Sequence, residues 1–82
     1  MNEITHTLTE NGFTVVVTGT VDMLCRPRLY LATEITFNGK SYGYVSENVL
    51  LPTFDLPNAM RIAIDWVELT ARNSMPHPEV IL

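Results

Sequence analysis

Apolar and polar side chains alternate along the first part of the chain, with the period of two that a half-buried β-strand requires. Two alternating stretches flank the dipeptide Asn11-Gly12, and one face of them carries Ile4, His6, Leu8, Phe13, Val15, Val17 and Val21. Asn-Gly is a strong hairpin signal, because both residues tolerate the positive φ of a two-residue turn. The predicted hairpin sets Leu8 opposite Val15 and His6 opposite Val17, with the apolar side chains of both strands on one face.

The same pattern returns around Asn38-Gly39 and predicts a second hairpin. A two-residue turn there sets Ile35 opposite Tyr42. The next pair on that face is Thr33 with Tyr44. The other face then carries a mixed set of side chains, namely Tyr30, Ala32, Glu34, Thr36, Ser41, Val45 and Glu47.

Two further glycines, Gly19 and Gly43, lie inside the predicted strands. A glycine in a strand weakens the strand unless it serves a purpose, and it often marks a β-bulge or a close approach of another backbone. We therefore expect one of these two features at each position.

The period changes after Pro52, where an amphipathic helix is predicted over residues 55–72. Asp55 occupies the N-cap position, and Pro57 is tolerated in the first turn because its missing N–H has no partner there. Two prolines lie within residues 73–82, so this segment is predicted to be a short tail, whose last four residues, 79–82, either add a short strand or pack against the domain.

These elements predict a single domain over residues 1–82, with a sheet in residues 1–51. The fold class is α+β: a two-layer sandwich of a four-stranded antiparallel sheet followed by one helix on one face, in the order ββββα. The composition, 46% hydrophobic and 17% charged, is typical of a folded chain and not of a disordered one.

The helix carries more apolar surface than one contact with a sheet requires. With residues spaced at about 100°, the charged positions occupy an arc of only about 100°. Ile62, Trp66 and Leu69 form a distinct ridge at one side of the apolar surface. We predict that this ridge is an interface, most simply a twofold one between identical chains. In the competing interpretation, residues 80–82 of the tail fold over the ridge in a monomer.

The net charge of −4 and the pI near 4.9 disfavour direct binding to nucleic acid, which needs clustered cations. Arg26 and Arg28 form the only basic cluster, and the same deficit disfavours an anionic membrane surface. No apolar run approaches the roughly 18 residues that span a bilayer. The first residues are polar and resemble no secretory signal, so a cytoplasmic location is expected.

Candidate chemistry is sparse, and neither an enzyme, nor a cofactor, nor a metal site is predicted. His6 and His77 lie at opposite ends of the chain, and a metal site would need a further ligand such as Asp22 or Glu79. Cys25 is next to Arg26, whose charge favours a thiolate, but a nucleophile also needs a positioned base and oxyanion donors.

The sequence therefore favours a non-enzymatic protein-interaction module, a small accessory or regulatory protein of a bacterium or phage that binds a protein partner. A second interpretation is a small-molecule-binding domain or enzyme subunit with a pocket between helix and sheet, near Trp66, Tyr42 and Tyr44. A third is an acidic decoy that blocks a nucleic-acid-binding protein. Its phosphate-like carboxylates would be Asp22, Glu34, Glu47, Asp55 and Asp65.

Overall fold

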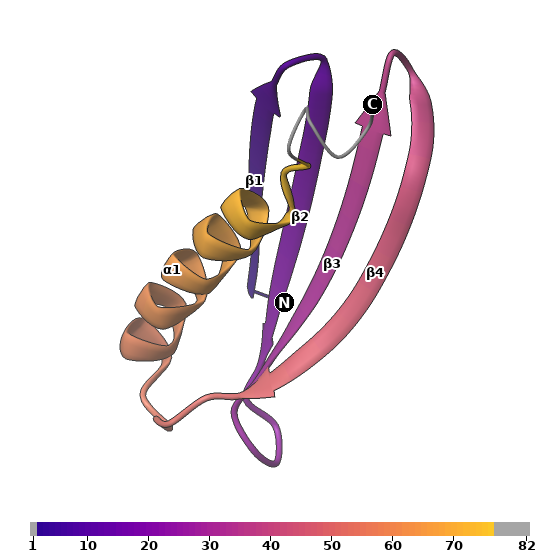
Figure 1. The fold of residues 1–82 in the computed structure, drawn as a ribbon. Coiled ribbons are helices and arrows are strands. Elements are labelled where there is room, and N and C mark those ends of the chain that lie inside the picture. The colour runs from indigo at the N-terminus through magenta and orange to yellow at the C-terminus, as the bar shows by residue number, and fades with distance from the viewer. Residues whose placement is uncertain (1, 77–82) are drawn as a thin grey trace.

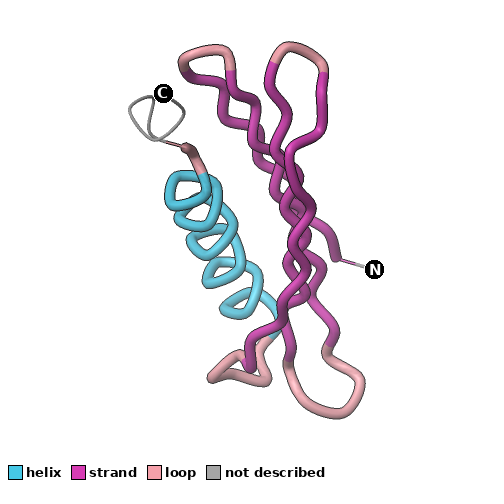
Figure 2. The backbone as a smooth tube through the Cα atoms, turned by 45° about the vertical axis from the view of Figure 1, so that its right-hand side comes forward, coloured by secondary structure: helices cyan, strands magenta, loops and turns pink. Residues whose placement is uncertain are grey.

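A computed structural model describes residues 2–76 of the chain. Its strands are β1 (Asn2–Glu10), β2 (Phe13–Asp22), β3 (Arg28–Phe37) and β4 (Lys40–Leu50), and its helix is α1 (Leu56–Ser74). The strands form one antiparallel sheet in the order β1-β2-β3-β4, and α1 packs on one face of it (Figure 1). Figure 2 shows the two layers from the side. The predicted α+β order ββββα is confirmed.

Both predicted hairpin turns are present. Their central residues have positive φ throughout, with values of 54° and 83° at Asn11-Gly12 and of 50° and 81° at Asn38-Gly39. Positive φ at both positions is the requirement of a type I′ turn, whose twist matches that of the flanking strands. The first hairpin has the predicted register, with Leu8 opposite Val15.

The second hairpin departs from its predicted register by one residue. Beyond the turn, Ile35 lies opposite Gly43 and not opposite Tyr42, so the prediction for this pair is wrong. Tyr42 is the additional residue of a β-bulge. The Tyr42 ring meets the edge of Phe37, with ring centroids 6.1 Å apart. Gly43 therefore marks a bulge, one of the two features expected at a strand glycine.

Because side-chain direction alternates with every residue, the extra residue of the bulge moves each side chain after it in β4 to the face opposite to the one predicted without a bulge. Tyr44 lies opposite Glu34, on the face of the sheet that points away from α1, which we call the outer face. Val45 lies opposite Thr33 and Glu47 opposite Leu31, on the helix side. The sequence-based placement of Tyr44 on the helix side, and of Val45 and Glu47 on the outer face, is corrected accordingly.

The core lies between α1 and the central strands. A line of small side chains on α1 is fully buried, and it consists of Ala59, Ala63, Val67 and Ala71. Opposite this line are buried side chains of β2 and β3: Val15, Val17, Val21, Leu29 and Leu31. Gly19 lies beneath Val67, where a Cβ atom would stand 2.6 Å from Val67 Cγ2. Gly19 thus marks a close approach, but of the Val67 side chain and not of another backbone, the feature expected from the sequence.

The ends of α1 are set by local hydrogen bonds. The Asp55 side chain accepts the backbone N–H of Asn58 at 3.1 Å, so Asp55 is the predicted N-cap. At the other end the helix continues to Ser74, two residues beyond the predicted Arg72, before Pro76 follows. The predicted tail contact of residues 80–82 lies outside the described residues. Over residues 2–76, no helix has the length and hydropathy to cross a membrane.

Candidate docking surface

The helix covers only part of the sheet. Within the described residues, the backbone of α1 lies close to β1, β2 and β3 but nowhere close to the backbone of β4. A helix with its side chains is about 10 Å wide and neighbouring strands are about 4.8 Å apart, so one helix covers about two of four strands. In Figure 1, α1 lies on the β1 side of the sheet, with its upper end in front of β1, and β4 is the strand farthest from it. Within residues 2–76, no second layer covers most of the helix side of β4.

Four residues of β4 form this uncovered surface. We call Gly43, Val45, Glu47 and Val49 the open floor; they pair with helix-side residues of β3. Val45 is 56% exposed, an unusually high value for a valine on the core-facing side of a sheet. Val49 is half-buried at the edge of the core, and Glu47 is exposed. The open floor is therefore largely accessible to a partner.

The ridge predicted from the sequence is also exposed. Trp66 and Leu69 are 39% and 53% exposed, whereas Ile62 is half-buried and packs against the core. Together with Asp65, these three residues line a shallow hollow of about 170 Å³. The structure thus brings the predicted ridge residues together at the surface.

The ridge and the open floor are on the same side of the helix. Along α1, Trp66 and Ile64 lie on opposite flanks of the buried line, each about 80° from its centre. In the view of Figure 1, α1 runs upward to the left of the sheet, with its upper end in front of β1, and β4 is on the right. Because an α-helix is right-handed, the flank of Trp66 then faces β3 and β4, and the flank of Ile64 faces away from them. The ridge therefore borders the uncovered side of the sheet.

Aromatic side chains lie at the hairpin end of the helix side of the sheet. Phe13 and Phe37 stack with ring centroids 4.5 Å apart, and Tyr42 extends this row from the bulge. Phe13 is buried while Tyr42 is 64% exposed, so the row rises from the core to the surface. The bulge therefore adds an exposed aromatic side chain next to Gly43 of the open floor.

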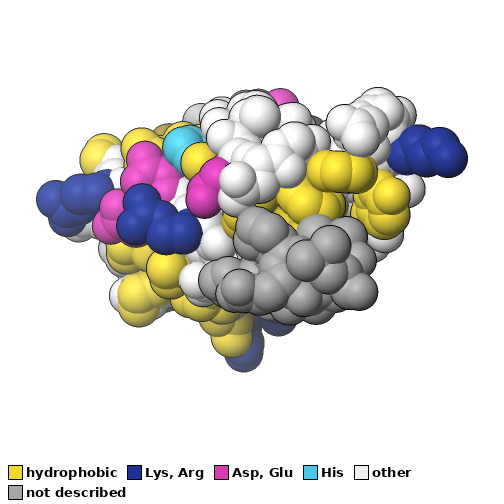
Figure 3. Space-filling view, turned by 45° about the horizontal axis from the view of Figure 1, so that its top comes forward, with side chains coloured by type: hydrophobic (Ala, Val, Ile, Leu, Met, Phe, Trp, Pro, Cys, Tyr) yellow, Lys and Arg dark blue, Asp and Glu magenta, His cyan; other side chains and the backbone are white. Residues whose placement is uncertain are grey.

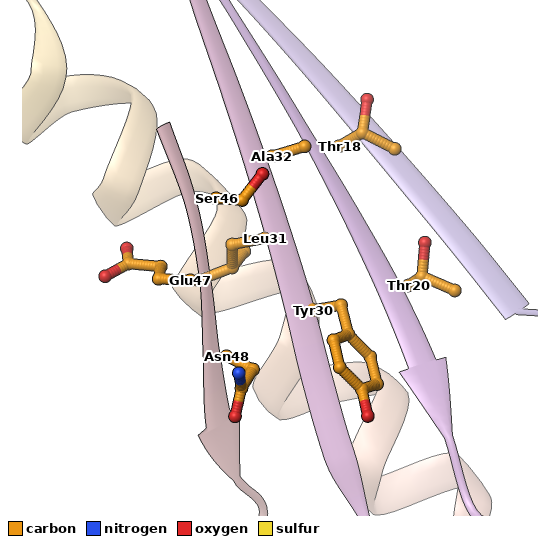
Figure 4. A pocket seen from close by; sticks show the side chains of 8 residues that line it. All are labelled: Thr18, Thr20, Tyr30, Leu31, Ala32, Ser46, Glu47 and Asn48. Carbon is orange, nitrogen blue, oxygen red and sulfur yellow. The ribbon is translucent and has the colours of Figure 1, made fainter. Parts of the chain in front are cut away.

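A second hollow, of about 250 Å³, lies on the outer face over β2, β3 and β4 (Figure 4). Its floor is a cross-strand row of small side chains: Thr18, Ala32 and Ser46. The neighbouring row contains Thr20, Tyr30 and Asn48, and Asn48 Oδ1 accepts a hydrogen bond from Arg28 at 2.6 Å. The hollow presents hydroxyl and amide groups, without a paired nucleophile and base, and it supports no particular reaction.

The candidate chemical residues do not converge. His6 is half-buried on β1 opposite Val17, and Cys25 is exposed in the β2–β3 loop. The Asp22 side chain accepts the backbone N–H of Leu24 at 2.9 Å, so Asp22 orders that loop. No group of three metal-ligating side chains occurs among residues 2–76. His77 and Glu79 lie outside that range.

The acidic side chains do not form one patch either. Glu34 is on the outer face, Glu47 is on the helix side, and Asp65 is exposed on α1. Asp22 and Asp55 accept hydrogen bonds from backbone groups nearby in the chain. Figure 3 shows acidic and basic side chains next to one another on the face in view. The five carboxylates are therefore distributed over different surfaces.

Helical periodicity predicts the ridge, but strand periodicity misses the open floor because it places Val45 on the outer face. The signal that marks the correct face is Gly43, next to the bulge.

Comparison with models of known protein families found no match, and comparisons with curated proteins and with solved structures found none either.

Proposed function

We propose that the chain is a non-enzymatic protein-interaction module whose docking surface is the groove between the ridge and the open floor. The observation that carries the proposal is the joint exposure of Trp66, Leu69 and Val45 on the two sides of this groove. Exposed apolar side chains that include a tryptophan are typical of protein–protein interfaces, where aromatic anchors contribute much of the binding energy.

The dimensions of the groove favour one kind of partner. α1 leaves the helix side of one strand, β4, uncovered, and a helix about 10 Å wide is broad enough to cover it. An amphipathic helix of the partner, laid beside α1, would bury its apolar face on the ridge and the open floor. Glu47 on the floor and Asp65 beside the ridge favour lysine or arginine at the margins of that apolar face.

The simplest alternative form of the proposal is a homodimer in which two identical ridges meet. A twofold contact needs only one self-complementary patch, and Ile62, Trp66 and Leu69 supply one. In that form Trp66→Glu converts a dimer to a monomer, which light scattering measures. Both forms use the same side chains, and they differ in whether the partner is a foreign protein.

The two other functions considered from the sequence, a small-molecule-binding domain or enzyme subunit and an acidic decoy, have weaker support. A pocket near Trp66, Tyr42 and Tyr44 requires the three side chains to converge, but Tyr44 is on the outer face and the other two are on the helix side. An acidic decoy requires a dense array of carboxylates, and Glu34 and Glu47 point to opposite faces of the sheet.

An affinity pulldown from cells of the native host tests the proposal. The wild-type chain is compared with Trp66→Glu and with the matched control Ile64→Glu, since Ile64 is 42% exposed on the opposite flank and Trp66 is 39% exposed. We expect a protein that the wild type and Ile64→Glu retain and that Trp66→Glu loses, while circular dichroism shows both variants folded. Equal retention by both variants, or equal loss from both, would contradict a docking role for the ridge.

A further inference from the structure

We propose that two copies of this chain pair along the free edges of their β4 strands, which makes a symmetric dimer with one continuous sheet. This self-association goes beyond the docking groove, because it uses the backbone of β4 and does not require the ridge. β4 is 11 residues long, contains no proline and, among residues 2–76, borders only β3. A long exposed edge of this kind is a template for another strand.

The hairpin turn determines which backbone groups of β4 are free. A two-residue turn makes Phe37 and Lys40 a hydrogen-bonded pair, and such pairs alternate along an antiparallel ladder. After the bulge, Gly43, Val45, Glu47 and Val49 bond to β3. The residues between them, Tyr44, Ser46, Asn48 and Leu50, therefore direct their N–H and C=O groups away from the sheet.

The sequence of β4 favours one register for a twofold contact. Ser46 is the midpoint of residues 42–50. A twofold axis at Ser46 therefore pairs this whole part of β4 with the same residues of the second chain. Tyr44 then lies opposite Asn48 of the second copy, and Val45 lies opposite Glu47 of the second copy. An axis one residue later would place two Glu47 carboxylates directly opposite each other, which is unfavourable.

The pairing supplies a contact of reasonable size. The Ser46 pair and the two Tyr44–Asn48 pairs each exchange two bonds, which gives about six main-chain hydrogen bonds. Specific interfaces contain about ten, with a spread of about five. The other edge of the sheet, β1, is in contact with α1, so a strand added there would meet the helix flank. In the described part of the chain, β4 is the edge that α1 does not flank.

The arrangement also explains why the helix side of β4 is bare. An axis perpendicular to the sheet keeps both helices on the same face, one over each end of the extended sheet. The two open floors become neighbours in the middle, and each Trp66 ridge faces them. One wide groove between two helices then replaces two narrow ones.

Light scattering on the full chain at micromolar concentration tests the pairing. We expect a mass of twice the 9.2 kDa of one chain. Ser46→Pro removes an outward N–H without removing a bond to β3, so it should reduce the mass by half. Thr7→Pro is the matched control, because its N–H points outward from β1, and it should remain dimeric. A monomeric wild type, or a dimer that survives Ser46→Pro, overturns the proposal.

A cysteine pair provides a second measurement if Ser46→Pro does not fold. In a Cys25→Ser background, Ser46→Cys places two thiols at the axis, where paired Cα atoms are about 5.5 Å apart and within disulfide range. Mild oxidation should crosslink this variant and leave the equivalent Thr7→Cys variant uncrosslinked. Equal crosslinking of the two variants overturns the pairing. A dimer that Trp66→Glu dissociates, and that these β4 changes do not affect, assigns self-association to the ridge.

Discussion

Gly19 and Val67 bring α1 and β2 closer together than any side chain at position 19 would permit. A Cβ atom on Gly19 would lie 2.6 Å from Val67 Cγ2 and 3.1 Å from Leu29 Cδ1. The alanines of α1 continue this close contact along the helix. The position of the helix over β1 and β2, which leaves β4 bare, therefore depends on small residues at the helix–sheet contact.

Gly19→Ala is expected to lower the free energy of unfolding by about 1–3 kcal/mol, because the added methyl group overpacks a buried contact. Gly43→Ala is the control, since a Cβ atom there meets nothing within 4 Å. It should be neutral or stabilising by up to about 1 kcal/mol. Urea unfolding measures both, and equal effects of the two changes would refute the close approach.

The two turn glycines should differ in a predictable order. Gly39→Ala forces an alanine to a φ of 81° in open space, which costs about 1 kcal/mol or more. Gly12→Ala has the same φ problem, and its Cβ would also lie 2.9 Å from Phe37 Cε2. We therefore expect a larger loss for Gly12→Ala in thermal melts. The reverse order would show that Phe37 does not confine the first turn.

The period of the side chains and the Asn-Gly turns predicted the strands, their order and the first register. Turn residues and alternation are local properties, so a single sequence carries them. The bulge at Tyr42 was not predictable by period, because one extra residue changes the face of everything after it without changing the composition. The exposed ridge followed from helical geometry. The open floor did not follow from the sequence pattern. Whether α1 covers β4 depends on where the helix lies on the sheet, and this depends on the contact between Gly19 and Val67, which are far apart in the sequence.

The bulge gives the two tyrosines of β4 different roles at nearly equal exposure, 64% for Tyr42 and 66% for Tyr44. Only Tyr42 meets Phe37, whereas Tyr44 is on the outer face. Tyr42→Ala should therefore destabilise the fold by about 0.5–1.5 kcal/mol more than Tyr44→Ala. Chemical denaturation of the two variants side by side checks this. Indistinguishable midpoints would mean that the aromatic row contributes no stability.

The N-cap of α1 should respond to the chemistry of its side chain. Asp55→Ala removes the acceptor for the Asn58 N–H and should cost about 0.5–2 kcal/mol. Asp55→Asn keeps an acceptor at the same position and should cost only a few tenths of a kcal/mol, since the two residues cap about equally well. The measurement is the difference in unfolding free energy. Equal losses for both variants would assign the effect to the carboxylate charge and not to the cap.

Site-specific photocrosslinking in cells of the native host tests most directly whether the ridge and the open floor form one docking surface. A benzophenone amino acid replaces Val45, Leu69 or Ile64, which are 56%, 53% and 42% exposed. The groove predicts that Val45 and Leu69 capture the same protein, identified by mass spectrometry, and that Ile64 does not capture it. Capture of different proteins from Val45 and Leu69, or capture of the same protein from Ile64, would contradict a single groove between helix and sheet.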